Sequence, residues 1–134
     1  MRNPVTEIHL VLNLWPPSLN EYWRSYKGRN ILSKKARVFC TKAIEQMRIA
    51  RTQKLIPLGA VITPVAVDIE LWPPDRRSRD IDNYTKGIFD ALTKGGVWSD
   101  DRLAWDLHLH WARGTVKGGK ICITIEPYDY FTHK

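Results

Sequence analysis

The sequence predicts a mixed α+β fold in a single compact domain spanning residues 1–134, with a sheet packed against two helices. Three observations predict it. Several segments alternate apolar and polar residues, as half-buried strands do, and two others carry apolar residues at helical spacing. Hydrophobic residues make up 43% of the 134 residues, which is enough to form one core. The expected order of elements is β-α-β-α-β-β.

The first strand is expected within residues 5–14. Its apolar positions alternate there until the pair Pro16-Pro17 ends the run; they are Ile8, Leu10, Leu12 and Leu14. The following segment, residues 18–30, mixes polar, aromatic and basic residues without clear periodicity. It is interpreted as a loop that contacts a ligand.

A helix is expected to begin after Ser33, a residue type that favours the N-cap position. Its apolar positions follow helical spacing: Ala36, Phe39, Cys40, Ala43, Met47 and Ala50. A second strand is expected from about residue 65 to 72, where apolar and polar residues alternate again until Pro73-Pro74.

A second helix is expected from Asp82, as its N-cap, to the glycine pair Gly95-Gly96. Residues 103–111 and 121–125 then alternate, and the glycine-containing stretch 114–119 between them predicts a hairpin. Residues 129–134 are expected to form a short C-terminal tail.

The net charge and the cysteine content limit the classes of function that the chain can have. Lysine and arginine number 21 against 14 acids, giving a net charge of +7, which favours a polyanionic partner without identifying one. The two cysteines, Cys40 and Cys122, have no C-x-x-C spacing and indicate neither a zinc site nor a disulfide framework. No apolar run approaches a membrane span. We expect a cytoplasmic protein with no membrane partner.

An acidic cluster stands out in this basic chain. Residues 75–86 contain three acids, three arginines and one lysine, and Asp100-Asp101 follows beyond the second helix. In an extended chain Asp80 and Asp82 point the same way, and clustered carboxylates are the ligands that Mg²⁺ prefers. Because the helix between is roughly 18 Å long, Asp101 reaches them only if the chain doubles back or a dimer forms.

This cluster predicts a metal-dependent enzyme acting on nucleic acid. Bound Mg²⁺ would activate water, and Lys86 would stabilise charge on a scissile phosphate or protonate the leaving oxygen. Taken singly, Asp82 is better explained as a helix cap and Lys86 as a solvent-exposed helix residue. Taken together with Asp80 and Asp101, they favour the metal site.

Basic residues around the cluster are candidates for DNA contact. Arg76, Arg77 and Arg79 precede the acids in a loop and suit phosphate contacts, although compensating the neighbouring acids is a competing explanation. Arg24 and Lys27 belong to the polar segment expected to touch the ligand.

Two histidines, His108 and His110, share the polar face of a predicted strand with Asp106. This spacing is compatible with a transition-metal site. Histidines on a solvated strand face are common, however, and the sequence shows no further ligands.

Two segments resemble a known family. The stretch from Pro73 to Asp101, with its Arg-Asp-x-Asp-Asn and Trp-x-Asp-Asp motifs, closely resembles the signature of the RusA family of Holliday junction resolvases. Residues 14–24 resemble the N-terminal motif of that family, and the final hairpin also fits. The resemblance covers nearly the whole chain.

The resemblance implies an endonuclease that acts as a homodimer on branched DNA. Such enzymes bind four-way junctions and cut two opposed strands symmetrically in recombination and repair, with Mg²⁺ or Mn²⁺ and no small-molecule cofactor. Matched by position in these motifs, the resemblance implies four catalytic residues, Asp80, Asp82, Lys86 and Asp101, of which the three aspartates are metal ligands. Asp100 belongs to the family pattern without being an assigned ligand, and Glu21 departs from it. A bacterial or prophage origin is expected.

Two other functions remain open at the level of sequence. The same residues would serve a nuclease for flaps or other branched DNA, with a different substrate groove. They would also fit a non-catalytic DNA-binding module whose acids are structural.

Overall fold

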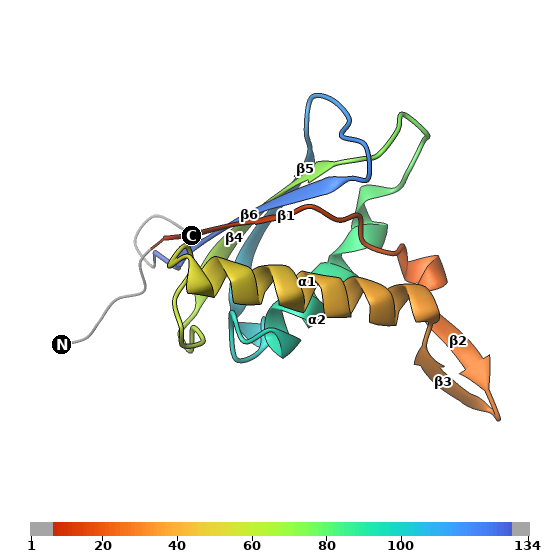
Figure 1. Ribbon diagram of the computed structural model, residues 1–134, viewed down its shortest axis with the longest axis horizontal. Helices are drawn as coiled ribbons and strands as arrows, with labels where there is room; N and C mark the ends of the chain where they lie inside the picture. The colour runs from red at the N-terminus through yellow and green to blue at the C-terminus, as the bar shows by residue number, and fades with distance from the viewer. Residues whose placement is uncertain (1–6, 130–134) are drawn as a thin grey trace.

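The computed structural model describes residues 7–129, so most of the predicted C-terminal tail lies outside the described residues (Figure 1). In this part of the chain two helices and six strands make up the fold, in agreement with the predicted α+β class. In chain order they are β1 Ile8–Leu12, β2 Trp23–Tyr26, β3 Arg29–Leu32, α1 Lys34–Thr52, β4 Val65–Trp72, α2 Thr85–Lys94, β5 Ala104–Trp111 and β6 Lys120–Pro127. Three short 3-10 helices lie between them: η1 Leu19–Glu21, η2 Ile81–Tyr84 and η3 Asp101–Leu103.

Four strands form the main sheet in the order β1-β6-β4-β5. β4 is antiparallel to β6 and parallel to β5. The predicted hairpin between the last two strands is therefore wrong, because β4 lies between them. Residues 112–119 carry the chain past the end of β4. Alternation revealed both strands correctly, but it carries no information about which strands pair.

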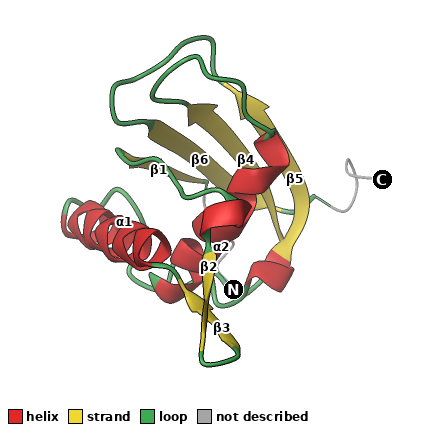
Figure 2. Cartoon of the chain, turned by 90° about the vertical axis from the view of Figure 1, so that its right-hand side faces the viewer, coloured by secondary structure: helices red, strands yellow, loops and turns green. Residues whose placement is uncertain are grey.

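The core lies between one face of this sheet and the two helices. Alternate residues of the central strands, Val65, Val67, Ile69 and Leu71 of β4 and Ile121, Ile123 and Ile125 of β6, are at most 3% exposed. Figure 2 shows both helices on one side of the sheet. The opposite face, which carries residues such as Asp68 and Glu70, is left without a helix.

Helix α1 begins as predicted. The Ser33 side chain accepts a hydrogen bond from the backbone N–H of Ala36 at 3.1 Å, which satisfies one free donor of the first turn. Five of the six predicted apolar positions are buried, whereas Cys40 is partly exposed.

Residues 18–30 are not the loop that the sequence predicted. They form η1 and then enter a two-stranded antiparallel hairpin, β2 and β3. Its two turn residues, Lys27 and Gly28, have φ of 50° and 76°, the backbone geometry of a tight hairpin turn. The hairpin projects from the body of the protein (Figure 1), and because neither face is buried in the core, its sequence shows no alternation.

The predicted N-cap of the second helix also needs correction. Asp82 lies inside η2, and α2 begins at Thr85. Tyr84 is buried against the rings of Trp15 and Trp111, so tertiary packing shapes this turn into a 3-10 segment. The helix ends as predicted, at Gly95, and Gly96 follows with a φ of 74°.

No helix within residues 7–129 combines the length and apolar character that crossing a membrane would require.

Candidate active site

The two aspartates of the central motif lie at the entrance to α2. Asp80 has an extended backbone, with φ of −90° and ψ of 119°, and directly precedes η2, which contains Asp82. Both residues are exposed, and neither uses its side chain to cap a helix. The helix-cap explanation for Asp82 is therefore excluded, which leaves its carboxylate available for another role.

Lys86 belongs to a network of side chains that joins α2 to the N-terminal segment. Its Nζ lies 3.4 Å from Oδ1 of Asp90, one turn further along the helix. The buried Tyr22 donates a hydrogen bond from its hydroxyl to the other carboxylate oxygen of Asp90. Lys86 Nζ also lies 6.0 Å from the ring centroid of Trp23, at the start of the hairpin.

Burial raises the pKa of Tyr22 above its usual range, and the neighbouring Asp90 carboxylate raises it further. The hydroxyl therefore stays protonated and keeps donating to Asp90. As a result, Tyr22 of the N-terminal motif holds Asp90, the ion-pair partner of Lys86, in position. The sequence does not reveal this connection.

Asp100 and Asp101 follow a turn that is held in place by the buried side chain of Trp98. Trp98 is fully buried, and its Nε1 donates to Thr93 Oγ1 at 2.8 Å. Asp100 is the N-cap of η3, where its carboxylate accepts from the backbone N–H of Arg102 at 2.9 Å, and this bond lowers its pKa. Asp100 thus has a structural role, whereas Asp101 is exposed.

The three predicted metal ligands do not converge within one chain. Within residues 7–129, the only group of three or more His, Cys, Asp or Glu side chains with ligand atoms within 4.8 Å of one another lies elsewhere, at Asp68, His108 and His110. The architecture explains the separation of Asp101 from Asp80 and Asp82. Tyr84 of η2 packs on Trp111, the last residue of β5, with ring centroids 6.2 Å apart. Asp101 instead precedes the start of β5, a strand about 25 Å long.

The arginines before the acids have different surroundings. Arg79 has a side chain only 9% exposed; its guanidinium donates to the Asp75 carboxylate at 2.8 Å and lies 5.6 Å from the Trp15 ring. Arg77 pairs with Asp75 at 3.2 Å, and Arg76 is exposed. A hydrogen bond from the Arg77 backbone N–H, aided by both guanidinium groups, lowers the pKa of Asp75 to about 2.

Arg77 and Arg79 therefore compensate the negative charge of Asp75, as the competing explanation expected. This explanation does not apply to Asp80 and Asp82, because within residues 7–129 no arginine forms an ion pair with either of them. The loop keeps a net positive charge.

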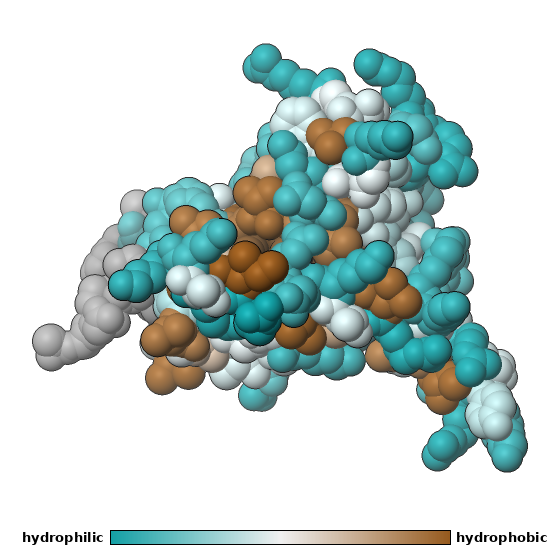
Figure 3. Space-filling view, viewed as in Figure 1, coloured by the Kyte–Doolittle hydropathy of each residue, from teal (hydrophilic) through white to brown (hydrophobic). Residues whose placement is uncertain are grey.

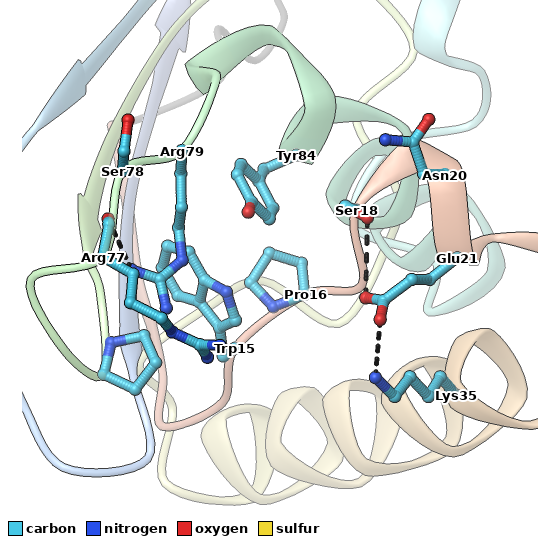
Figure 4. A pocket seen from close by; sticks show the side chains of 11 residues that line it. Trp15, Pro16, Ser18, Asn20, Glu21, Lys35, Arg77, Ser78, Arg79 and Tyr84 are labelled. Carbon is cyan, nitrogen blue, oxygen red and sulfur yellow. Dashed lines mark hydrogen bonds and ion pairs between the residues drawn. The ribbon is translucent and has the colours of Figure 1, made fainter.

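A cavity of about 530 Å³ separates this loop from the N-terminal segment (Figure 4). Arg77 and Arg79 line one side, and Glu21 lies on the other, paired with Lys35 at 2.7 Å. That pair lowers the pKa of Glu21 and accounts for the acid that departs from the family pattern. The full lining consists of Trp15, Pro16, Ser18, Asn20, Glu21, Lys35, Pro74, Arg77, Ser78, Arg79 and Tyr84.

A second hollow of about 350 Å³ lies on the other side of the arginine loop. Arg76, Arg77 and Arg79 line it together with Arg113 from the connection between β5 and β6. Sequence reasoning missed Lys35 and Arg113. Arg113 lies between the last predicted strands, just before the predicted turn at residues 114–119, and no sequence motif marks it as part of the site.

Arg24 and Lys27 lie on the projecting hairpin and line neither hollow. Each stacks near the ring of Tyr26, at 5.6 and 5.4 Å from its centroid. In the space-filling view, hydrophilic side chains cover much of this hairpin, at the lower right, and of the loops at the top of the molecule (Figure 3). The predicted DNA-contacting residues thus fall into two separate groups.

The donor set fits a hard cation. Asp80 and Asp82 offer exposed carboxylate oxygens, the ligand type that Mg²⁺ and Mn²⁺ prefer. Two carboxylates leave the other coordination positions of such a cation to water, a substrate phosphate or a further protein ligand.

Comparison with known proteins identifies the family. Residues 14–126 match the endodeoxyribonuclease RusA family. The crossover junction endodeoxyribonuclease RusA of Escherichia coli O139:H28 (strain E24377A / ETEC) is 39% identical over 111 residues, covering 83% of this chain and 88% of the relative. The protein of the same name from Escherichia coli strain K12 is 38% identical over 111 residues, and that of Enterobacteria phage 82 is 39% identical over 113, both with the same coverage. The resemblance in the sequence is confirmed: the chain belongs to the endodeoxyribonuclease RusA family.

Proposed function

We propose that this chain is a Mg²⁺-dependent endonuclease that resolves four-way DNA junctions by paired, symmetric strand cuts in the cytoplasm of a bacterial cell. The observation that carries the proposal is the exposed pair Asp80 and Asp82 at the entrance to α2, flanked by Lys86 and the basic arginine loop. Curated relatives carrying the name crossover junction endodeoxyribonuclease support the choice of substrate.

Asp80 and Asp82 would hold the metal, which supplies an activated water and neutralises charge on the scissile phosphate. Lys86, which is exposed and pairs with Asp90, would stabilise the developing phosphate charge. Arg76, Arg77 and Arg79 would hold phosphates on the same side of the molecule, beside the two hollows.

Two symmetric cuts require two sites, and a two-fold homodimer provides them. The edge strand β5 is the surface that favours self-association. Leu107 is 40% exposed although its register partner is the core residue Val67, and Trp105 of the same strand is 54% exposed. An exposed apolar edge strand of this length is suited to pairing with another strand.

Antiparallel pairing of β5 with its copy would also complete the metal site. It sets the start of one β5 beside the end of the other, which is where η2 lies. The partner subunit's Asp101 would then approach Asp80 and Asp82, accounting for the separation of these residues within one chain.

The activity is tested by cleavage of a synthetic four-way junction beside linear duplex and flap DNA. We expect Mg²⁺-dependent paired cuts in the junction, no cleavage by Asp82→Asn with junction binding retained, and a large loss of turnover in Lys86→Ala. Lys94→Ala, at the exposed end of the same helix, is the control and should cleave normally. Equal cutting of linear duplex or flap DNA would replace the junction resolvase by a nuclease for other DNA structures. If no substrate is incised, the protein would be a non-catalytic DNA-binding module.

Mixing two inactive variants tests the shared site. In a heterodimer of Asp82→Asn with Asp101→Asn, a site built across subunits leaves one centre with both aspartates intact and the other with neither. We therefore expect the mixture to regain single-strand incision. If each site lies within one subunit, both centres stay defective and the mixture remains inactive.

A further inference from the structure

Asp68, His108 and His110 form a compact cluster on the face of the sheet opposite the helices. Oδ1 of Asp68 lies 2.8 Å from Nδ1 of His108, and Oδ2 lies 3.1 Å from Nε2 of His110. The two imidazole rings stack with their centroids 4.5 Å apart. The sequence interpretation paired the histidines with Asp106, whereas the structure gives them Asp68 as the shared carboxylate.

The sheet itself builds this cluster. His108 and His110 are two residues apart in β5, so their side chains leave the same face. Asp68 is the register partner of His108 in the neighbouring parallel strand β4. The alignment therefore depends on a regular strand pair and not on a loop.

The cluster is separate from the proposed nuclease site in both position and charge. Its face of the sheet is acidic, with Glu70 opposite His110 and Glu126 beside a hollow of about 230 Å³ that also includes Asp68 and His108. Such a face repels the DNA backbone and attracts cations. The arginine loop, in contrast, lines hollows that contain none of these residues.

We propose that Asp68, His108 and His110 bind a transition-metal ion of the Zn²⁺ class, with a remaining position open to solvent. Nδ1 of His108, Nε2 of His110 and one Asp68 oxygen would be the ligands. These atoms lie within 4.8 Å of one another, and tetrahedral Zn²⁺ with bonds of about 2.1 Å holds its ligands about 3.4 Å apart, so small side-chain rotations complete the site.

Ligand chemistry separates this site from the proposed Mg²⁺ centre. Imidazole nitrogens suit Zn²⁺, Co²⁺, Ni²⁺ or Cu²⁺, whereas Mg²⁺ favours sites built from oxygen ligands alone. An ion bound here would join the edge strand β5 to β4 and hold the strand in place. His108 is 73% exposed and His110 34%, so the ion has a direct route from solvent.

The test is metal titration of the untagged, chelator-treated full chain. Co²⁺ binding is followed by its visible absorption and Zn²⁺ binding by calorimetry, at neutral pH with saturating Mg²⁺ present. We expect one ion per chain, and a loss of affinity of at least about 10-fold in each of Asp68→Asn, His108→Asn and His110→Asn. Circular dichroism checks that each variant is folded.

Two controls make the result specific. His9→Asn changes a histidine on the same sheet face, two strands away from Asp68, and should bind as the unmodified protein does. Asp80→Asn, a proposed Mg²⁺ ligand, should also leave Zn²⁺ and Co²⁺ binding unchanged. Saturating Zn²⁺ should raise the melting temperature of the unmodified protein, but not that of His110→Asn.

Absence of a saturable site in the folded protein, or an affinity in all three cluster variants equal to that of the unmodified protein, would overturn the proposal. The histidines would then serve only as ion-pair partners of Asp68. This outcome is independent of junction cleavage, which is measured with Mg²⁺ alone.

Discussion

Replacing Tyr22 with phenylalanine tests the network that supports Lys86. The substitution removes only the hydroxyl of a side chain that is 3% exposed and that donates to Asp90. Hydrogen bonds to charged groups contribute about 1.5–3 kcal/mol. Because Asp90 keeps its ion pair with Lys86, we expect a loss near the lower end, about 1.5–2 kcal/mol.

This loss can be expressed as a change in melting temperature. At about 2.1 cal/mol/K per residue, the entropy of unfolding of this 134-residue chain is about 0.28 kcal/mol/K. Tyr22→Phe should therefore melt about 5–7 °C below the unmodified protein. Differential scanning calorimetry and urea titration, at the same pH and salt, measure the two quantities independently.

Tyr26→Phe is the matched control, because Tyr26 lies on the same hairpin and is 48% exposed. Its loss should stay within about 0.5 kcal/mol. If both variants lose the same stability, the hydrogen bond to Asp90 does not stabilise the fold and the reasoning is refuted. Junction cleavage by Tyr22→Phe should fall further than junction binding, since the bond orients the partner of Lys86.

Two other perturbations test the loops around the site. Gly119→Ala places a Cβ 2.7 Å from Cβ of Trp15 at a φ of +80°, whereas Gly28→Ala meets no atom within 4 Å at a φ of +76°. Both should lose about 1–2 kcal/mol to backbone strain, and Gly119→Ala a further 1–3 kcal/mol or so to overpacking; equal losses in urea titrations would contradict the contact. Asp75→Asn should lower the melting temperature at neutral pH. Since the fold lowers the pKa of Asp75 from 3.8 to about 2, its stabilisation is present above about pH 4 and disappears as pH falls toward 2. Melting curves from pH 7 to pH 2 should therefore converge, and a constant difference would show that the carboxylate charge is not responsible.

Much of the fold could be predicted because it is encoded locally. Residues 65–72 alternate and form β4 with the predicted bounds, Ser33 caps α1, and Gly95-Gly96 ends α2. In each case the decisive interactions lie within a few residues: an alternating buried face, a side chain bonded to the next turn, or a backbone conformation that favours glycine.

The central motif of the candidate site was also visible in the sequence for a local reason. Asp80, Asp82 and Lys86 are close along the chain, so any regular structure keeps them near one another. The hairpin was missed for the opposite reason. Its strands are exposed on both faces, and a strand that buries no face leaves no alternation in the sequence.

The sequence by itself determined the four strands of the main sheet, the two helices and the short-range part of the acidic motif. Only the tertiary structure decided that β4 separates β5 from β6, that Asp101 does not join Asp80 and Asp82 in one compact ligand group, and that Asp68 meets both histidines. The physical reason is common to all three. Periodicity records which face of an element is buried, but the partner of that element depends on packing between segments that are distant in the chain.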